Sequence, residues 1–121
     1  MARRRILIVE DSPLVTDAFS VLFTEAGYDV AVAGTVADAI ARAGDKPVDV
    51  MLLDLTLPDG DGVEVMEALR QQARLPRATL AMTGHSDTAS RRSCIEAGCA
   101  DVLVKPVPIR ELLRQIERLL A

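Results

Sequence analysis

Acidic, hydroxyl and ammonium side chains directly follow the short apolar runs of this 121-residue chain. In a sheet of parallel strands, the carboxyl ends of the strands meet at one edge, and the polar side chains that follow the strands gather there. If the apolar runs are such strands, three carboxylates, one hydroxyl and one ammonium group converge on a single site. The five side chains belong to Glu10, Asp11, Asp54, Thr83 and Lys105.

This cluster is suited to phosphoryl chemistry with a bound divalent cation. Carboxylates about 4 Å apart repel one another by about 4 kcal/mol per pair at an effective dielectric constant of about 20, so a fold keeps them together when a cation neutralises them. Oxygen ligands without His or Cys favour Mg²⁺, which commonly accompanies phosphoryl groups. Asp54 is then a candidate nucleophile that becomes an aspartyl phosphate, with Lys105 and Thr83 available to phosphoryl oxygens. Because like charges oppose ionisation, at least one of the carboxyl groups should have a raised pKa.

The apolar runs alternate with segments of helical period along the whole chain. Five strand–helix units follow one another without a linker or a repeat, which predicts an α/β fold with one parallel sheet and helices on both faces. The chain is expected to form one domain over residues 1–121. The strands are expected at 6–9, 29–33, 48–53, 78–82 and 102–104, and the helices at 13–26, 36–43, 63–73, 87–97 and 109–120.

Local signals mark where some of these elements begin and end. Ser12 is expected to cap the first helix, with Pro13 at its first position. Thr35 is expected to cap the second helix, and Gly44 to end it. The segment 55–62 is rich in turn residues and is predicted to be a loop.

Composition disfavours several classes of function. The net charge of −4 argues against a nucleic-acid or anionic-membrane surface, and aromatic residues, at 2% of the chain, are too few to stack bases. No apolar run approaches a membrane span, and the few apolar residues after Arg5 are too short for a signal peptide. We therefore expect a cytoplasmic protein. Cys94 and Cys99 lack the spacing of a zinc site and are expected to be small, buried, reduced residues.

The sequence resembles the receiver domain of two-component response regulators, such as the chemotaxis receivers, along essentially its whole length. Each matching piece is weak by itself, but five pieces in order at family-like spacing are specific. The resemblance implies a flavodoxin-like (βα)5 fold with strand order 2-1-3-4-5. The matching pieces are Ile-Leu-Ile-Val-Glu-Asp at 6–11, Leu-Leu-Asp-Leu-Thr-Leu-Pro-Asp-Gly-Asp-Gly at 52–62, Met-Thr-Gly at 82–84, Ala-Gly at 97–98 and Leu-Val-Lys-Pro at 103–106.

The resemblance also implies a role for each residue of the cluster. The protein would be a phosphorylation switch that catalyses only its own phosphorylation and autodephosphorylation, and not a metabolic enzyme. Pro106 matches a proline that usually follows a cis peptide bond. By the same resemblance, Asp54 is the phospho-acceptor, Glu10, Asp11, Asp54 and the backbone carbonyl of Thr56 hold Mg²⁺, and Thr83 and Lys105 contact the phosphoryl group.

The family resemblance further implies the partners of such a switch. The phosphoryl donor would be a phosphohistidine on a sensor histidine kinase or on a histidine phosphotransfer protein. The signal would pass to a downstream target protein or to an output domain, with no direct binding to nucleic acid or membrane. Leu14 and Val15 either help to dock a histidine-bearing helix or belong to a wide core face of the first helix. His85, the only histidine, is interpreted as an exposed loop residue whose place in the family can tune the access of water.

One position departs from the family pattern. Three residues before the lysine, the family usually has Tyr or Phe, whose ring turns inward when the threonine moves, and this chain has Val102 there. The phosphorylation site is complete, whereas the usual threonine–aromatic readout is in question.

Two other functions compete with the receiver interpretation. Phosphatases with an aspartate nucleophile favour a second catalytic aspartate two residues later, and this chain has Thr56 at that position. They also enclose the substrate with a cap domain, for which no segment is present. A phosphate-independent interaction module would usually lose acidic or lysine positions of the site, and none is lost here.

Overall fold

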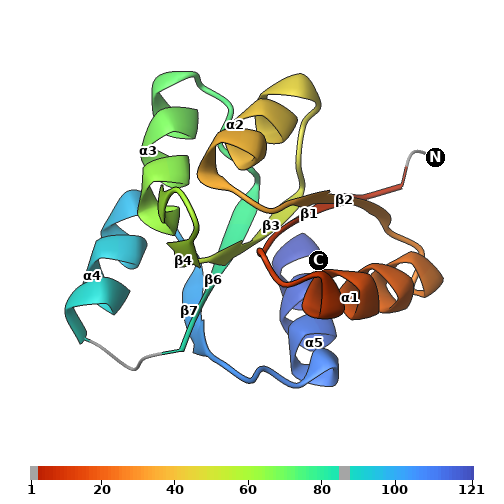
Figure 1. Cartoon of the computed structure of the whole chain (residues 1–121). Helices are drawn as coiled ribbons and strands as arrows, with labels where there is room; N and C mark the ends of the chain where they lie inside the picture. Colours follow the sequence, from red (N-terminus) through yellow and green to blue (C-terminus); the bar gives the residue numbers. More distant parts are fainter. Residues whose placement is uncertain (1–2, 85–87) are drawn as a thin grey trace.

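Five parallel strands form the central sheet in the computed structural model, which describes residues 3–84 and 88–121. Their spatial order is β2-β1-β3-β6-β7 (Figure 1). Counted along the chain, these sheet strands have the order 2-1-3-4-5, so the predicted fold is confirmed. The strands are β1 (Arg5–Val9), β2 (Asp29–Ala33), β3 (Val50–Asp54), β6 (Ala78–Thr83) and β7 (Asp101–Val104).

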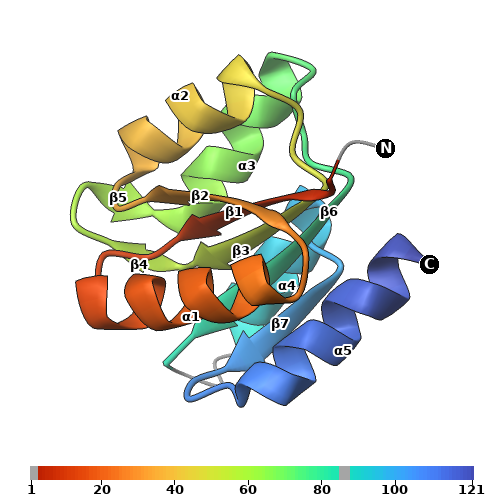
Figure 2. The same ribbon diagram turned by 90° about the vertical axis from the view of Figure 1, so that its right-hand side faces the viewer.

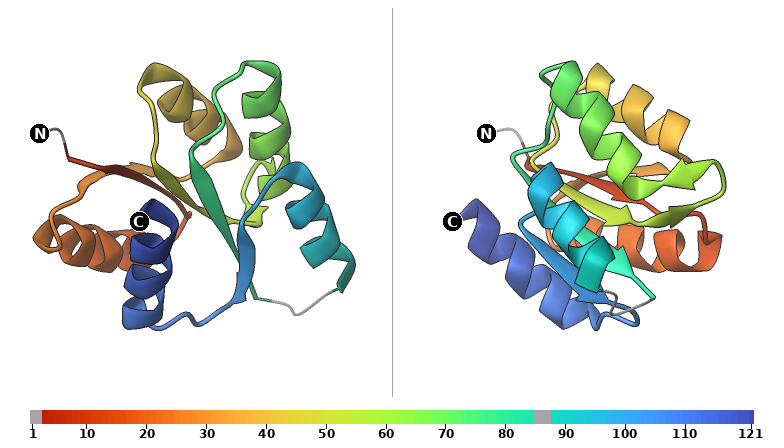
Figure 3. Two further views of the ribbon diagram at one scale, coloured as in Figure 1. Left: turned by 180° about the vertical axis from the view of Figure 1, so that it is seen from behind. Right: turned by 90° about the vertical axis from the view of Figure 1, so that its left-hand side faces the viewer.

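Helices cover both faces of this sheet, as Figures 1 and 2 show. On one face, α1 (Pro13–Glu25) and α5 (Ile109–Leu120) pack against alternate side chains of the strands, including Ile6 and Ile8. On the other face, α2 (Val36–Asp45), α3 (Gly62–Gln71) and α4 (Thr88–Ala97) cover Leu7 and Val9. Figure 3 shows α4 beside α3 on this second face. The central strands are buried on both faces, which explains why β1 and β3 lack alternating polar residues.

The helix starts follow the predicted signals in part. Thr35 caps α2 as expected, because its hydroxyl accepts a hydrogen bond from the backbone N–H of Asp38 at 3.0 Å. Ser12 occupies the N-cap position of α1, but its side chain makes no capping bond. Instead, the Ser12 N–H donates to Glu10 Oε1 at 3.3 Å, so the carboxylate of Glu10 meets the start of α1. The prediction that Gly44 ends α2 was wrong, since the helix continues through Asp45.

The segment predicted to be a plain loop contains a short hairpin. Strands β4 (Thr56–Leu57) and β5 (Gly60–Asp61) pair in antiparallel fashion. Helix α3 then begins at Gly62, one residue earlier than expected, and Asp61 caps it by accepting the Val63 N–H at 2.9 Å. Two-residue strands carry too short an alternation of polar and apolar residues to be recognised in a sequence.

The remaining boundaries agree to within two residues where the structure describes them. The expected start of the fourth helix at Asp87 lies outside the described residues, as does His85. Within the two described ranges, no helix combines the length and the apolar character needed to cross a membrane.

Candidate functional site

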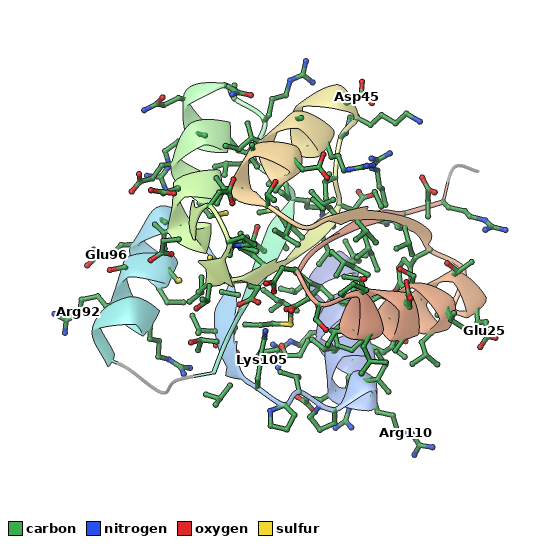
Figure 4. All side chains as sticks on the ribbon, in the orientation of Figure 1. Glu25, Asp45, Arg92, Glu96, Lys105 and Arg110 are labelled. Atoms are coloured by element: carbon green, nitrogen blue, oxygen red, sulfur yellow. The ribbon has the colours of Figure 1, made fainter. Side chains whose placement is uncertain are left out.

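The predicted residues lie at the carboxyl edge of the central sheet. Glu10 directly follows β1, Asp54 is the last residue of β3, Thr83 is the last residue of β6, and Lys105 directly follows β7. Figure 4 shows Lys105 at this edge, between α1 and β7. Parallel strands that end together bring these positions close, although they are far apart in the sequence.

Three carboxylates form a compact group at this edge. Ligand oxygens of Glu10, Asp11 and Asp54 all lie within 4.8 Å of one another. Glu10 and Asp54 are each only 4% exposed, whereas Asp11 is exposed to solvent. The donor set is purely oxygen, which fits a hard divalent cation such as Mg²⁺ better than zinc. The expected acidic cluster is therefore present, and its chemistry suits the expected metal.

The ammonium group of Lys105 bridges the two buried carboxylates. Its Nζ lies 2.8 Å from Glu10 Oε2 and 2.8 Å from Asp54 Oδ2. Burial acts to lower the pKa of Lys105, but the hydrogen bonds to Asp54 and Glu10 outweigh burial and raise it. Lys105 therefore stays charged and neutralises part of the cluster.

The cluster as a whole remains negative. Burial is the largest cause that raises the pKa of Glu10, Asp54 raises it further, and Lys105 partly offsets both. The raised pKa of Glu10 agrees in direction with the expectation for one carboxyl group, although burial and not the repulsion between like charges is its largest cause. With three carboxylates and one ammonium group, the site has room for two further positive charges, which is the charge of Mg²⁺.

The hairpin after β3 fixes the orientation of Asp54. The backbone N–H of Thr56 donates to Asp54 Oδ1 at 3.0 Å, so the two carboxylate oxygens of Asp54 have different partners. The Thr56 side chain itself is exposed. Gly62 lies against the same strand end, where a Cβ would collide with the carbonyl oxygen of Asp54. Any larger residue at 62 would therefore push the hairpin away from the site.

Thr83 joins the site through the backbone that leads to Lys105. Its carbonyl oxygen accepts the Lys105 N–H at 2.7 Å, and the residue is 7% exposed. The peptide bond between Lys105 and Pro106 is cis, as the resemblance implied. This hydrogen bond holds the end of β6 against the residue that follows β7, so the side chains of Thr83 and Lys105 start from neighbouring backbone positions.

Sequence reasoning missed Asp59, which lies in the turn between β4 and β5. Its Oδ1 accepts the Val36 N–H at 2.7 Å, and its Oδ2 accepts the Ala37 N–H at 3.1 Å. The bond from Val36 is the largest cause that lowers the pKa of Asp59. Asp59 therefore ties the hairpin to the N-terminus of α2. An acidic residue between Pro58 and Gly60 signals a turn, but nothing in the sequence tells which helix it meets.

Three further predictions concern residues around the site. Val102 is 3% exposed and packs in the core under α4, so no aromatic ring lies at that position. Cys94 and Cys99 are buried free thiols, as expected, and burial raises the pKa of Cys99 to about 12. Leu14 is 82% exposed, which rules out a core role for this residue, while its expected contact with a partner stays a prediction.

Comparison with known proteins points to one family. The family model of the response regulator receiver domain matches residues 6–117. The TorCAD operon transcriptional regulatory protein TorR of Escherichia coli O157:H7 is 36% identical over 115 residues, which are 95% of this chain and 49% of that protein. The transcriptional regulatory protein KdpE of Mycobacterium tuberculosis is 32% identical over 111 residues, which are 92% of this chain and 48% of that protein. The chain thus spans about half the length of these curated relatives.

Solved structures agree with this assignment. A CheY-like receiver domain protein from Methanospirillum hungatei has a TM-score of 0.89 and 28% identity, covering 98% of this chain and 94% of that one. The receiver domain of the sensor histidine kinase PA1611 from Pseudomonas aeruginosa has a TM-score of 0.85 and 30% identity, covering 97% of each chain. That structure is described with a magnesium ion coordinated in the active-site cleft. From its motifs, its strand order and these matches, the chain belongs to the response regulator receiver domains of two-component systems.

Proposed function

We propose that this chain is a phosphorylation switch in which Asp54 accepts a phosphoryl group. The observation that carries the proposal is the ammonium of Lys105, which bridges the buried carboxylates of Asp54 and Glu10 beside Asp11. A site that only stabilised the fold would not concentrate three carboxylates around one cation at a sheet edge. Such a site stabilises a bound phosphoryl group, because the phosphoryl oxygens can accept hydrogen bonds from the ammonium group of Lys105.

The residues of the site divide the chemistry among them. A carboxylate oxygen of Asp54 forms the new bond to phosphorus, while the bond from phosphorus to the donor nitrogen of a phosphohistidine breaks. During transfer, negative charge is spread over the phosphoryl oxygens, and Lys105 and Thr83 stabilise this charge. Glu10, Asp11, Asp54 and the backbone carbonyl of Thr56 would hold Mg²⁺, which supplies charge neutralisation and orients the phosphoryl oxygens.

The partners belong to the same proposal. A sensor histidine kinase or a histidine phosphotransfer protein in the cytoplasm supplies the phosphoryl group. The phosphorylated state is read by a downstream target protein or by an output domain. The net charge of −4 favours a protein as the direct partner over nucleic acid or an anionic membrane. The chain catalyses only its own phosphorylation on Asp54 and the hydrolysis of the resulting aspartyl phosphate.

The two competing functions account for fewer features of the site. A phosphatase with an aspartate nucleophile favours a second, acid–base aspartate two residues later, and the residue at that position is the exposed Thr56. A phosphate-independent module has no use for two buried carboxylates that share one lysine, since burying these charges costs desolvation energy.

Intact-mass analysis after incubation with Mg²⁺ and phosphoramidate tests the proposal. Wild-type protein should gain one phosphoryl group, and Asp54→Ala should gain none. Asp17→Ala, which removes an exposed carboxylate from α1, is the matched control and should be labelled like wild type. Labelling of Asp54→Ala to the wild-type level would show that the acceptor is another residue.

A further inference from the structure

An apolar cavity opens beside the phosphorylation site, between α1 and the segment that follows β7. Its volume is about 360 Å³, which lies within the range of small-molecule pockets in proteins. Leu14 is 82% exposed and therefore lies at the rim, while Val15 and Phe19 are partly buried. The apolar walls include Leu14, Val15, Ala18 and Phe19 from α1, and Met82 and Val107 from the opposite side.

The polar end of this cavity belongs to the phosphorylation site. Glu10 and Lys105 both line the cavity, and they are its charged residues. Lys105 Nζ also lies 2.8 Å from Asp54 Oδ2, so one lysine contacts the nucleophile and borders the apolar space. Figure 4 shows Lys105 between α1 and β7. A molecule in the cavity therefore lies next to a phosphoryl group at Asp54.

This juxtaposition has a consequence for phosphoryl donors that are small molecules. A donor consists of a phosphoryl group, which the charged cluster accepts, and a leaving group, which must lie beside it. The space beside the cluster is apolar, so a leaving group with an apolar body removes more apolar surface from water than a small polar one. A benzoyl group is comparable in size to a phenylalanine side chain and is small enough for this cavity.

We propose that the cavity is a leaving-group subsite, and that the chain prefers acyl phosphates with an aromatic or branched apolar body over acetyl phosphate. The proposal rests on Asp54 as the phospho-acceptor. In the reaction, an Asp54 carboxylate oxygen bonds to phosphorus, and the bond between phosphorus and the acyl oxygen breaks. The leaving carboxylate keeps the electron pair of that bond, so the reaction needs no proton and no further reactant.

Phosphorylation rates with two donors test the preference. Acetate and benzoate are leaving groups of similar basicity, so a difference between acetyl phosphate and benzoyl phosphate reports binding more than reactivity. With Mg²⁺ present, the half-saturating concentration of benzoyl phosphate should be about tenfold below that of acetyl phosphate, because part of the ring is removed from water. Equal half-saturating concentrations for the two donors would overturn the proposal.

Matched variants on α1 separate the cavity from the rest of the helix. Leu14→Asn with Val15→Thr makes the wall polar at nearly constant shape, and should abolish the preference for benzoyl phosphate over acetyl phosphate. Leu22→Asn with Val21→Thr makes the same changes on the same helix outside the cavity. This second pair should keep the preference. A preference that survives in the first pair would overturn the assignment of the cavity.

A binding measurement distinguishes failure of the subsite from failure of the proposed function. Benzoylphosphonate cannot transfer its phosphoryl group, because a carbon–phosphorus bond replaces the labile one. With Mg²⁺, it should shift the methyl signals of Val15, Met82 and Val107 in NMR spectra, and acetylphosphonate should not. Labelling by both donors without these shifts would overturn the subsite alone. The apolar wall would then be a contact surface for a partner protein and not a site for a leaving group. Absence of labelling with every donor would overturn the phospho-acceptor role of Asp54.

Discussion

At the level of single residues, Lys105 is the cation that keeps the two buried carboxylates of the site together. Its Nζ lies 2.8 Å from an oxygen of Glu10 and 2.8 Å from an oxygen of Asp54, and its side chain is 33% exposed. A buried carboxylate that loses its partner costs far more than the pair contributes, because its charge stays desolvated. Two carboxylates depend on this lysine, and they also repel each other.

Replacement of Lys105 should therefore destabilise the metal-free protein. Lys105→Met keeps most of the aliphatic stem, and we expect it to lower the free energy of unfolding by about 1–2 kcal/mol, less than for a fully buried pair because solvent reaches the lysine. Added Mg²⁺ should restore part of this loss. Urea titrations with and without Mg²⁺ measure both effects. Lys46→Met, at the other lysine of the chain, is exposed and should have little effect. Equal stability of the two variants would contradict the bridging role of Lys105.

At the level of elements, Asp59 couples the hairpin after Asp54 to the N-terminus of α2. Thr35 satisfies one backbone N–H at the start of the helix, and Asp59 satisfies two others across the loop. Carboxylates near helix N-termini are stabilised by unpaired N–H groups and by the helix dipole. The hairpin that presents the Thr56 N–H to Asp54 is therefore anchored at its far end.

The stabilising effect of Asp59 should depend on pH. Because the fold lowers the pKa of Asp59 below its ordinary value of 3.8, the contribution is present above that value and is lost as the pH falls through the folded-state pKa. We expect Asp59→Ala to lower the urea midpoint at pH 7, and the difference from wild type to narrow below about pH 3.8. The control Glu67→Ala removes an exposed carboxylate from α3. A difference that stays constant through this range would show that Asp59 does not act through its charge.

Strand β7 carries Val102 at the position where the family usually has an aromatic residue. Val102 is 3% exposed and packs in the core with Cys94 and Ala97, so this position holds no ring that could turn inward toward Thr83. We expect beryllofluoride with Mg²⁺, a phosphoryl mimic, to cause large amide shifts around Asp54 and only small ones on α5. Two-dimensional NMR of the free and treated protein measures this. Shifts on α5 as large as those around Asp54 would mean that another residue carries the signal.

At the scale of the whole molecule, the sequence predicted the sheet and the charged cluster because both depend on strong local patterns. The apolar runs around Leu7 and Leu52 are long enough to define buried strands, and polar residues at the strand ends then converge by topology. The two-residue strands of the hairpin, the reach of Asp59 to α2 and the double contact of Lys105 were not predicted. Each depends on the distance between segments that are remote in the sequence, which no local pattern contains.

The fold brings residues that are remote in the sequence into one cluster with a net negative charge, and the substitution Asp54→Asn tests how this charge affects the stability of the whole molecule. Three carboxylates face one ammonium group at the site, so the substitution reduces the excess from two negative charges to one. Without metal, the variant should unfold at higher urea, with a gain on the order of 1 kcal/mol, because the cleft is open to water and Lys105 also loses a partner. The Asn side chain can still accept the Thr56 N–H.

Mg²⁺ should reverse the order of stability between these two proteins. A ligand that binds only the folded state stabilises it more the more tightly it binds, and the variant offers one charged ligand fewer. Wild-type protein should therefore gain more from Mg²⁺ than Asp54→Asn, whereas the control Asp17→Asn should gain as much as wild type. Urea titrations of the three proteins over a range of Mg²⁺ concentrations measure this. If Asp54→Asn is less stable than wild type without metal, the ion pair between Asp54 and Lys105 outweighs the repulsion among the carboxylates. Repulsion at the site would then not destabilise the metal-free protein, and Mg²⁺ would have no such repulsion to relieve.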